Sequence, residues 1–134
     1  MIEVTKGIYR GPVLETITYQ LGLKSILNLQ TGGDTEELSQ CYRNGIALYD
    51  FDMLGFWVPK IEDVQLALSI MADSNTHPIY VHCRHGRERT GLLCAIYRMH
   101  YQDWSFGKAH EEMVRLGCRW THSWMLKYLE ERVG

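Results

Sequence analysis

The chain has 134 residues and a formal net charge of −2, and its composition is 46% hydrophobic and 22% charged. These values are typical of one soluble globular domain that can bury a core without disulfides or a structural metal. They argue against a general nucleic-acid binder or a membrane-surface protein, and no apolar run approaches the length of a transmembrane helix. We therefore expect one domain over residues 1–134.

The first quarter of the chain alternates short apolar segments with turn residues. Two strands are expected at Ile2–Val4 and Ile8–Arg10, where they form an edge hairpin. Pro12 is suited to begin a helix that runs to about Leu21, because its fixed φ already fits the first helical turn. A buried strand is expected next, at Ser25–Leu29.

The middle of the chain continues this alternation of strands and helices. Asp34 or Thr35 can cap a helix over Glu36–Arg43, because a short polar side chain satisfies the free amides of a first turn. The next strand is expected at Ile46–Phe51, and apolar residues at helical spacing predict a helix over Pro59–Ala72.

The second half begins with a strand at Pro78–His82 and an apolar, central helix over Thr90–Tyr101. Ser105 is expected to cap one further helix and Thr121 the last one. Strands separated by helices imply parallel pairing with helices on both faces. The sequence thus predicts an α/β domain with a central, mostly parallel sheet of four to five strands.

The segment Val81–Gly91 carries the chemistry, because its strand runs into Cys83 and Arg89 follows six positions later. Of the four cysteines, only this one has an arginine at that spacing. A strand, a loop and a helix start aim backbone N–H groups at one point, which makes an anion site. A thiol at that point is shifted toward thiolate and faces the bound phosphate as a nucleophile.

Several positions of this loop have an expected chemical role. Cys83 attacks phosphorus and forms a phosphocysteine intermediate, while the planar fork of Arg89 binds two phosphate oxygens. Gly86 is expected to take a positive φ, and Thr90 to hydrogen-bond the sulfur as it leaves. His82 is expected to hold the loop through backbone contacts rather than to exchange protons with substrate.

The loop is also strongly basic, since residues 82–91 hold three Arg and two His against one Glu. This balance concentrates positive potential where an anionic substrate would lie. The loop residues expected to contact substrate are Arg84, His85, Gly86, Arg87 and Glu88. For Glu88 the alternative is that it faces outward and pairs with Arg84 or Arg87. The histidines beside Cys83 have no second ligand cluster at zinc spacing, so no metal and no cofactor is expected.

Hydrolysis also needs a carboxyl group that protonates the leaving oxygen and then activates water. Asp50 and Asp52 lie at the end of the strand before the loop strand, where we expect the two strands to be neighbours. Asp52 is favoured because it lies nearer the strand's end; the alternative is that both face solvent or cap a turn. After them comes an apolar connection in which Phe56 and Trp57 either form a lip over the pocket or pack on the domain's own helices.

The four irregularly spaced cysteines favour a reducing cytosol, and Met1–Lys6 lacks the pattern of a signal peptide. Cys94 is expected in the core, while Cys41 or Cys118 as a disulfide partner of Cys83 stays open. The expected protein is a cytoplasmic monomer.

The motif from Val81 to Gly91 resembles that of the cysteine-based protein phosphatase superfamily, in its dual-specificity branch. It is most similar to the atypical plant and fungal group, whose loop reads Ile-His-Cys-x-x-Gly-Lys-x-Arg-Thr-Gly. Three further stretches are similar to that group: Ile8–Gly11, Leu21–Leu29 and Trp104-Ser105. The resemblance implies a nucleophilic Cys83, a phosphate-binding Arg89 and phosphotyrosine-type substrates, with inositol pyrophosphates for some members.

The apolar connection over residues 53–59 replaces a polar loop of that group, and this favours aromatic phosphoesters. The sequence therefore predicts a metal-independent cysteine phosphatase whose partner is a phosphorylated protein or a small anionic phosphoester. The alternatives are an inositol phosphate or phosphoinositide phosphatase, favoured by the three loop arginines, and a phospho-binding module without turnover. A similarity of the loop to RNA triphosphatases is a minor alternative.

Overall fold

The computed structural model describes residues 1–14, 19, 22–30, 34–52 and 58–134. Most of the helix expected from Pro12 to Leu21 lies outside the described residues, and so do Phe56 and Trp57. Among the described residues, no helix combines the length and apolarity that a membrane span requires.

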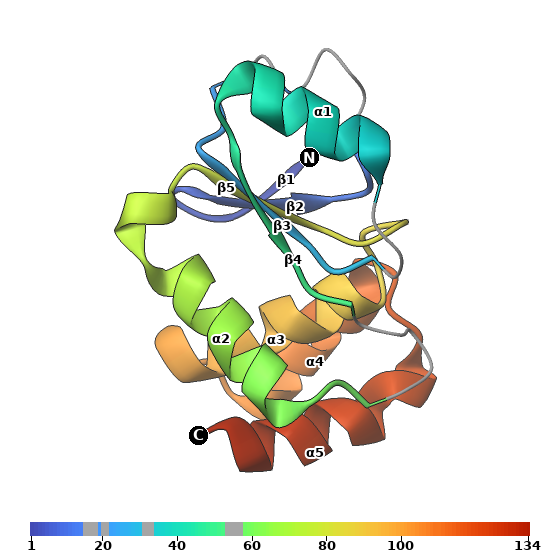
Figure 1. Cartoon of the computed structure of the whole chain (residues 1–134). Coiled ribbons are helices and arrows are strands. Elements are labelled where there is room, and N and C mark those ends of the chain that lie inside the picture. The colour runs from blue at the N-terminus through green and yellow to red at the C-terminus, as the bar shows by residue number, and fades with distance from the viewer. Residues whose placement is uncertain (15–18, 20–21, 31–33, 53–57) are drawn as a thin grey trace.

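A five-stranded sheet forms the centre of the molecule, with strand order β1-β2-β5-β3-β4 (Figure 1). The strands are β1 (Ile2–Thr5), β2 (Ile8–Gly11), β3 (Ser25–Asn28), β4 (Ala47–Asp50) and β5 (Ile79–His82). β1 pairs antiparallel with β2, and all other pairs are parallel, which confirms the mostly parallel sheet. β5 is the middle strand, so the loop that follows it leaves from the centre of the sheet.

Helices cover both faces of the sheet (Figure 1). They are α1 (Thr35–Asn44), α2 (Ile61–Ala72), α3 (Arg89–Tyr101), α4 (Phe106–Arg115) and α5 (Ser123–Val133), with short 3-10 turns at Ser74–Thr76 and Trp120–His122. α1 lies on one face, and α2 to α5 gather on the other (Figure 1). Each face has its own buried cluster, because the side chains of a strand alternate between the two faces.

The predicted helix ends are mostly confirmed. The Asp34 side chain accepts hydrogen bonds from the first-turn amides of α1, and the Ser105 hydroxyl accepts one from Lys108 N in α4. Thr121 was the wrong cap, because α5 begins only at Ser123, after the 3-10 turn Trp120–His122.

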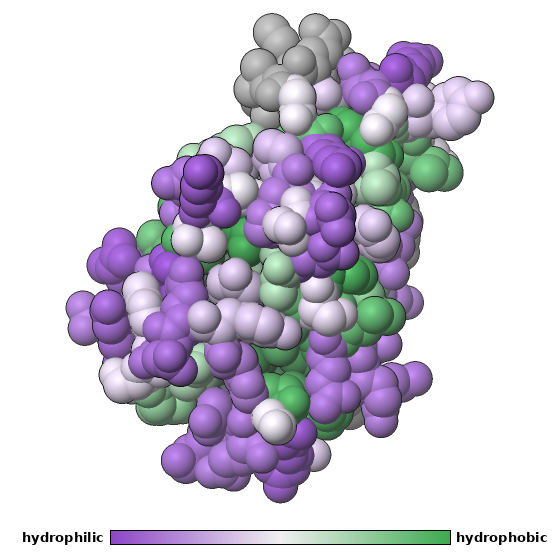
Figure 2. Space-filling view, turned by 90° about the vertical axis from the view of Figure 1, so that its left-hand side faces the viewer, coloured by the Kyte–Doolittle hydropathy of each residue, from purple (hydrophilic) through white to green (hydrophobic). Residues whose placement is uncertain are grey.

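Figure 2 views the molecule from the side that lies on the left in Figure 1, and the coloured residues on that face are mixed in character. Hydrophilic residues cover much of it, and the hydrophobic ones lie between them. Such interruption by polar side chains is ordinary for the surface of a soluble domain.

Candidate active site

Cys83 follows directly on β5, at the carboxyl end of the central strand, and the loop after it ends where α3 begins at Arg89. Cys83 is only 2% exposed and Thr90 is fully buried. Ligands bind open parallel sheets at this edge, because strand ends and helix N-termini converge there. The structure therefore places the predicted nucleophile where the sequence predicted it.

The environment of the Cys83 thiol favours its thiolate. Burial alone would raise the pKa of this thiol, but hydrogen bonds to the sulfur outweigh that effect and hold the pKa below its ordinary value. These bonds come from the hydroxyl and amide of Thr90 and from the amides of Gly86 and Arg87. Within the described part of the chain the Thr90 hydroxyl has no other hydrogen-bond partner, so it is available to the sulfur.

Arg89 opens α3 at the same end of the loop. Its Nε atom is buried and has no hydrogen-bond partner among the described residues. A buried donor left unpaired costs free energy, which a phosphate oxygen would repay by accepting its hydrogen bond. The converging loop amides and this guanidinium form a site suited to a tetrahedral anion.

The loop is held close to β2 by Gly86 and Arg10. Gly86 has a φ of +70°, and a Cβ there would lie only 2.3 Å from Gly11 C and 2.7 Å from Pro12 N. Arg10, only 2% exposed, donates from Nη2 to Gly86 O at 3.1 Å. The positive φ of Gly86 is thus confirmed, and the structure adds that the glycine is needed where the loop crosses the end of β2.

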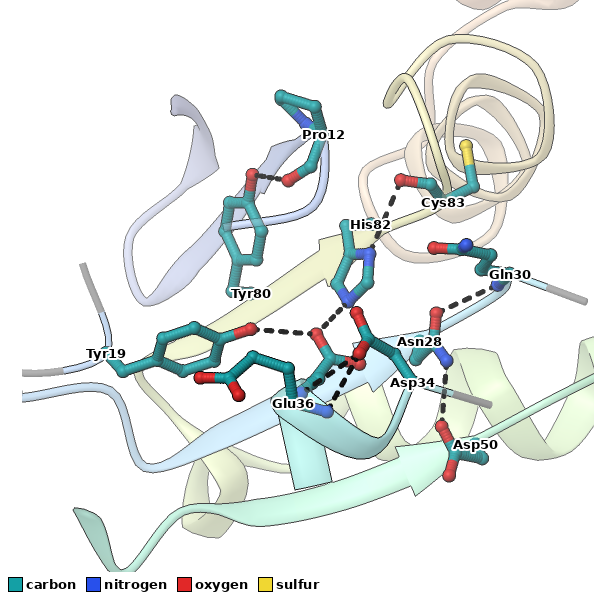
Figure 3. Close-up of polar contacts among 11 residues, drawn as sticks. Pro12, Tyr19, Asn28, Gln30, Asp34, Glu36, Asp50, Tyr80, His82 and Cys83 are labelled. Atoms are coloured by element: carbon teal, nitrogen blue, oxygen red, sulfur yellow. Dashed lines mark hydrogen bonds and ion pairs between the residues drawn. The ribbon is translucent and has the colours of Figure 1, made fainter. Parts of the chain in front are cut away.

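Directly before Cys83 in the chain, His82 lies between two acceptors (Figure 3). Its Nε2 lies 2.6 Å from Glu37 Oε2, and its Nδ1 lies 3.3 Å from Cys83 O. The ring therefore contacts α1 with one nitrogen and the loop backbone with the other. Tyr19 Oη donates to the same carboxylate at 3.4 Å. This confirms that His82 supports the loop backbone.

Sequence reasoning missed Arg10 and Glu37 as parts of the site. A charged residue inside a short strand was the available signal for Arg10, since an arginine there is buried only with a partner. Glu37 gave little signal, because an acidic residue in the first turn of a helix is expected for its interaction with the helix dipole alone. Only the packing of α1 on the sheet brings its carboxylate to His82.

Glu88 lies at the N-terminus of α3, and the prediction that it pairs with Arg84 or Arg87 was wrong. Its carboxylate lies 3.4 Å from both Arg119 Nε and His122 Nδ1, on the side of the connection between α4 and α5. These contacts hold both carboxylate oxygens of Glu88 away from the loop arginines. The role of Glu88 in substrate binding stays a prediction. Arg84, His85 and Arg87 are exposed at the loop surface, so they can still meet an anionic substrate.

Asp50 ends β4, but the expectation that β4 neighbours β5 was wrong, because β3 lies between them. Asn28 in β3 is in register with both Asp50 and His82. The backbone of Asp50 is therefore two strand spacings, about 10 Å, from that of His82 across the sheet. Asn28 Nδ2 donates to Asp50 Oδ1 at 2.8 Å (Figure 3). Asp52 is exposed and follows the end of the strand by two residues.

The four cysteines are free and buried, so none of them is joined to Cys83 by a disulfide. Cys94 is in the core as expected, and Cys41 belongs to the cluster on the opposite face of the sheet.

A cysteine with a lowered pKa, cradled by amides at the end of a central parallel strand and followed by an arginine, defines the class of cysteine-based phosphatase folds. The family profile described as "Tyrosine phosphatase family" matches residues 2–131. The chain therefore belongs to the tyrosine phosphatase family.

Individual relatives agree with this assignment. Inositol diphosphatase DSP3 of Arabidopsis thaliana is 35% identical over 127 residues, which make up 87% of this chain and 62% of that protein. The dual specificity protein phosphatase TpbA of Pseudomonas aeruginosa (strain UCBPP-PA14) is 38% identical over 60 residues, 45% of this chain and 28% of that protein. The chain thus spans less than two thirds of these relatives.

Among solved structures, the core catalytic domain of PP-IP phosphatase SIW14 from S. cerevisiae is similar, with a TM-score of 0.85 and 28% sequence identity. The match covers 97% of this chain and 85% of that one. The described fold is therefore close to a whole catalytic core of this family.

Proposed function

We propose that the protein is a cysteine phosphatase that hydrolyses phosphomonoesters through a phosphocysteine intermediate. The observation that carries the proposal is the position of the Cys83 sulfur at the end of β5, where the Thr90 hydroxyl and the amides of Gly86, Arg87 and Thr90 hydrogen-bond it and lower its pKa. Only the thiolate is a strong nucleophile, and a loop that merely binds phosphate does not need one. The Nε atom of Arg89 supports it, since this atom has no hydrogen-bond partner in the described part of the chain and is available to a phosphate oxygen.

The proposed reaction has two chemical steps. The Cys83 sulfur attacks phosphorus, the bond from phosphorus to the ester oxygen breaks, and Asp52 gives its proton to the leaving oxygen. Water then attacks the phosphocysteine, Asp52 takes a proton from that water, and the sulfur leaves as thiolate. Thr90 stabilises the leaving sulfur by its hydrogen bond. Loop amides and Arg89 stabilise the charge on the equatorial phosphate oxygens in both steps.

For the substrate, we propose a phosphorylated protein or an aryl phosphate, and we carry a diphosphorylated inositol as the second candidate. The basic surface of the loop favours the second one, because Arg84, His85 and Arg87 are all exposed around the anion site. The names of relatives point both ways, since DSP3 is called an inositol diphosphatase and TpbA a dual specificity protein phosphatase. The cytoplasmic location and the monomeric state stay predictions.

The test compares three substrates with a chelator present: para-nitrophenyl phosphate, a phosphotyrosine peptide and a diphosphorylated inositol. We expect wild type to turn over at least one of them without metal and Cys83→Ser to be inactive on all. A higher kcat/KM for the inositol substrate than for the peptide would establish the second candidate. If wild type bound phosphate yet turned over none of the three, the enzyme proposal would fail and the phospho-binding module would replace it.

A further inference from the structure

We propose that Glu88, Cys118 and His122 form a binding site for a zinc ion beside the catalytic loop. The three residues come from separate parts of the fold: the start of α3, the connection after α4 and the end of the turn Trp120–His122. One ligand atom of each, a carboxylate oxygen, the thiol sulfur and a ring nitrogen, lies within 4.8 Å of the other two. The sequence showed no such cluster, because Glu88 lies 30 residues before Cys118.

The distances fit tetrahedral zinc coordination. Glu88 Oε2 lies 3.4 Å from Cys118 Sγ and 3.4 Å from His122 Nδ1. Zinc bonds of about 2.3 Å to sulfur and about 2.0 Å to nitrogen or oxygen place tetrahedral ligands about 3.3–3.6 Å apart. Two of the three separations therefore already match, and only the one between sulfur and nitrogen, which is at most 4.8 Å, can need to shorten.

The chemistry of the three donors is also that of a zinc site. Thiolate, imidazole and carboxylate are the protein ligands that zinc takes, and three of them leave a fourth position for water. Cys118 is 2% exposed, while the side chains of His122 and Glu88 are 16% and 28% exposed. The cluster is therefore buried at the sulfur and accessible to solvent at the carboxylate and the imidazole. Water can therefore reach the fourth position.

Arg119 would compete with the ion for the carboxylate of Glu88. Its guanidinium Nε lies 3.4 Å from Glu88 Oε1, but its side chain is 77% exposed and can turn away into solvent. Its backbone N–H donates to Glu88 Oε2 at 3.3 Å and orients the carboxylate without blocking both of its oxygens. On binding, the S–H bond of Cys118 breaks, the sulfur bonds zinc and the proton goes to buffer.

Zinc at this place would tie the catalytic loop to the connection between α4 and α5. The two segments already touch without it, because Cys118 Sγ donates to Glu88 Oε2 at 3.4 Å. A metal bond to Glu88 and Cys118 would fix the same two segments more firmly than a hydrogen bond does.

The test uses untagged full chain with Cys83→Ser, so that the nucleophile cannot bind the metal, and Zn²⁺ or Co²⁺ alone as probes. We expect about one bound zinc per chain and, with Co²⁺, the absorption band of a thiolate ligand. Cys118→Ser should abolish the band, and His122→Gln should weaken binding at least about tenfold. Cys41→Ser, which removes an equally buried thiol from α1, is the matched control and should keep both.

A second measurement does not depend on whether the Cys118→Ser variant folds. Alkylation of the Cys83→Ser protein, mapped by mass spectrometry, should show zinc protecting Cys118 while leaving the labelling of Cys41 unchanged. Absence of bound zinc, a cobalt band that survives Cys118→Ser in folded protein, or labelling of Cys118 that zinc does not change would overturn the proposal.

Discussion

Glu37 Oε2 lies 2.6 Å from His82 Nε2, and the two side chains are 1% and 0% exposed. The contact joins α1 to the end of β5, and the other ring nitrogen of His82 lies 3.3 Å from Cys83 O, so α1 is connected to the start of the loop. A buried polar contact of this kind is costly to break, because the group that remains has lost its partner.

We therefore expect Glu37→Ala to lower the free energy of unfolding by about 3–5 kcal/mol, and Glu37→Gln, which keeps an oxygen acceptor, by about 1–3 kcal/mol. Urea denaturation at neutral pH measures both. Turnover of para-nitrophenyl phosphate should fall as well, because a displaced loop loses its alignment with the phosphate.

Glu36→Gln is the control for this prediction, because Glu36 is the exposed neighbour in the same helical turn. Its unfolding free energy should change by no more than about 0.5 kcal/mol. Equal effects of Glu36→Gln and Glu37→Gln would contradict a special role for the buried pair.

Thr90→Val should raise the pKa of Cys83, because it removes the hydroxyl that hydrogen-bonds the sulfur while keeping the shape of the side chain. The sign follows from the reactive form: a higher pKa leaves less thiolate at acidic pH, so alkylation by iodoacetamide slows there. Well above the ordinary thiol pKa both proteins are thiolate, and their rates should converge. The rate of Cys83 alkylation against pH measures this shift, and superimposable profiles would refute it.

Gly86→Ala should be strongly disruptive, because φ is +70° and the new Cβ would meet Gly11 C at 2.3 Å. We expect a loss of at least about 2 kcal/mol in unfolding free energy together with a loss of activity. Gly107→Ala is the matched control, since a Cβ there meets nothing within 4 Å and the residue lies in α4. That change should be neutral or stabilising by up to about 1 kcal/mol, as urea unfolding can establish.

Asp52→Asn should lower kcat by about 10²–10⁴-fold on a substrate with a poor leaving group, because the variant cannot donate a proton. The loss should be smaller with para-nitrophenolate, which leaves without protonation. Asp50→Asn should have the weaker effect, since Asp50 Oδ1 already accepts a hydrogen bond from Asn28. Steady-state kinetics on both substrates decide between them, and a larger loss for Asp50→Asn would transfer the acid role to that residue.

The sequence by itself determined the strands, most of the described helices and the geometry of the loop, because these depend on local patterns. The apolar run before Cys83 predicts a buried strand, Ser105 predicts a helix start, and a glycine inside a phosphate loop predicts a positive φ. Spacing within one segment sufficed for Cys83, Arg89 and Thr90, since a strand, a loop and a helix place them together wherever the rest of the chain lies.

Tertiary structure alone decided the order of the strands and the partners that come from distant segments. β3 lies between β4 and β5, which no local pattern encodes, and this separates Asp50 from the loop strand. Glu37 reaches His82 because α1 packs on one face of the sheet, and Glu88 meets Cys118 because the connection after α4 folds back on the loop. The physical reason is that the partner of a polar side chain in the interior depends on which segments pack together. Packing is a property of the whole chain.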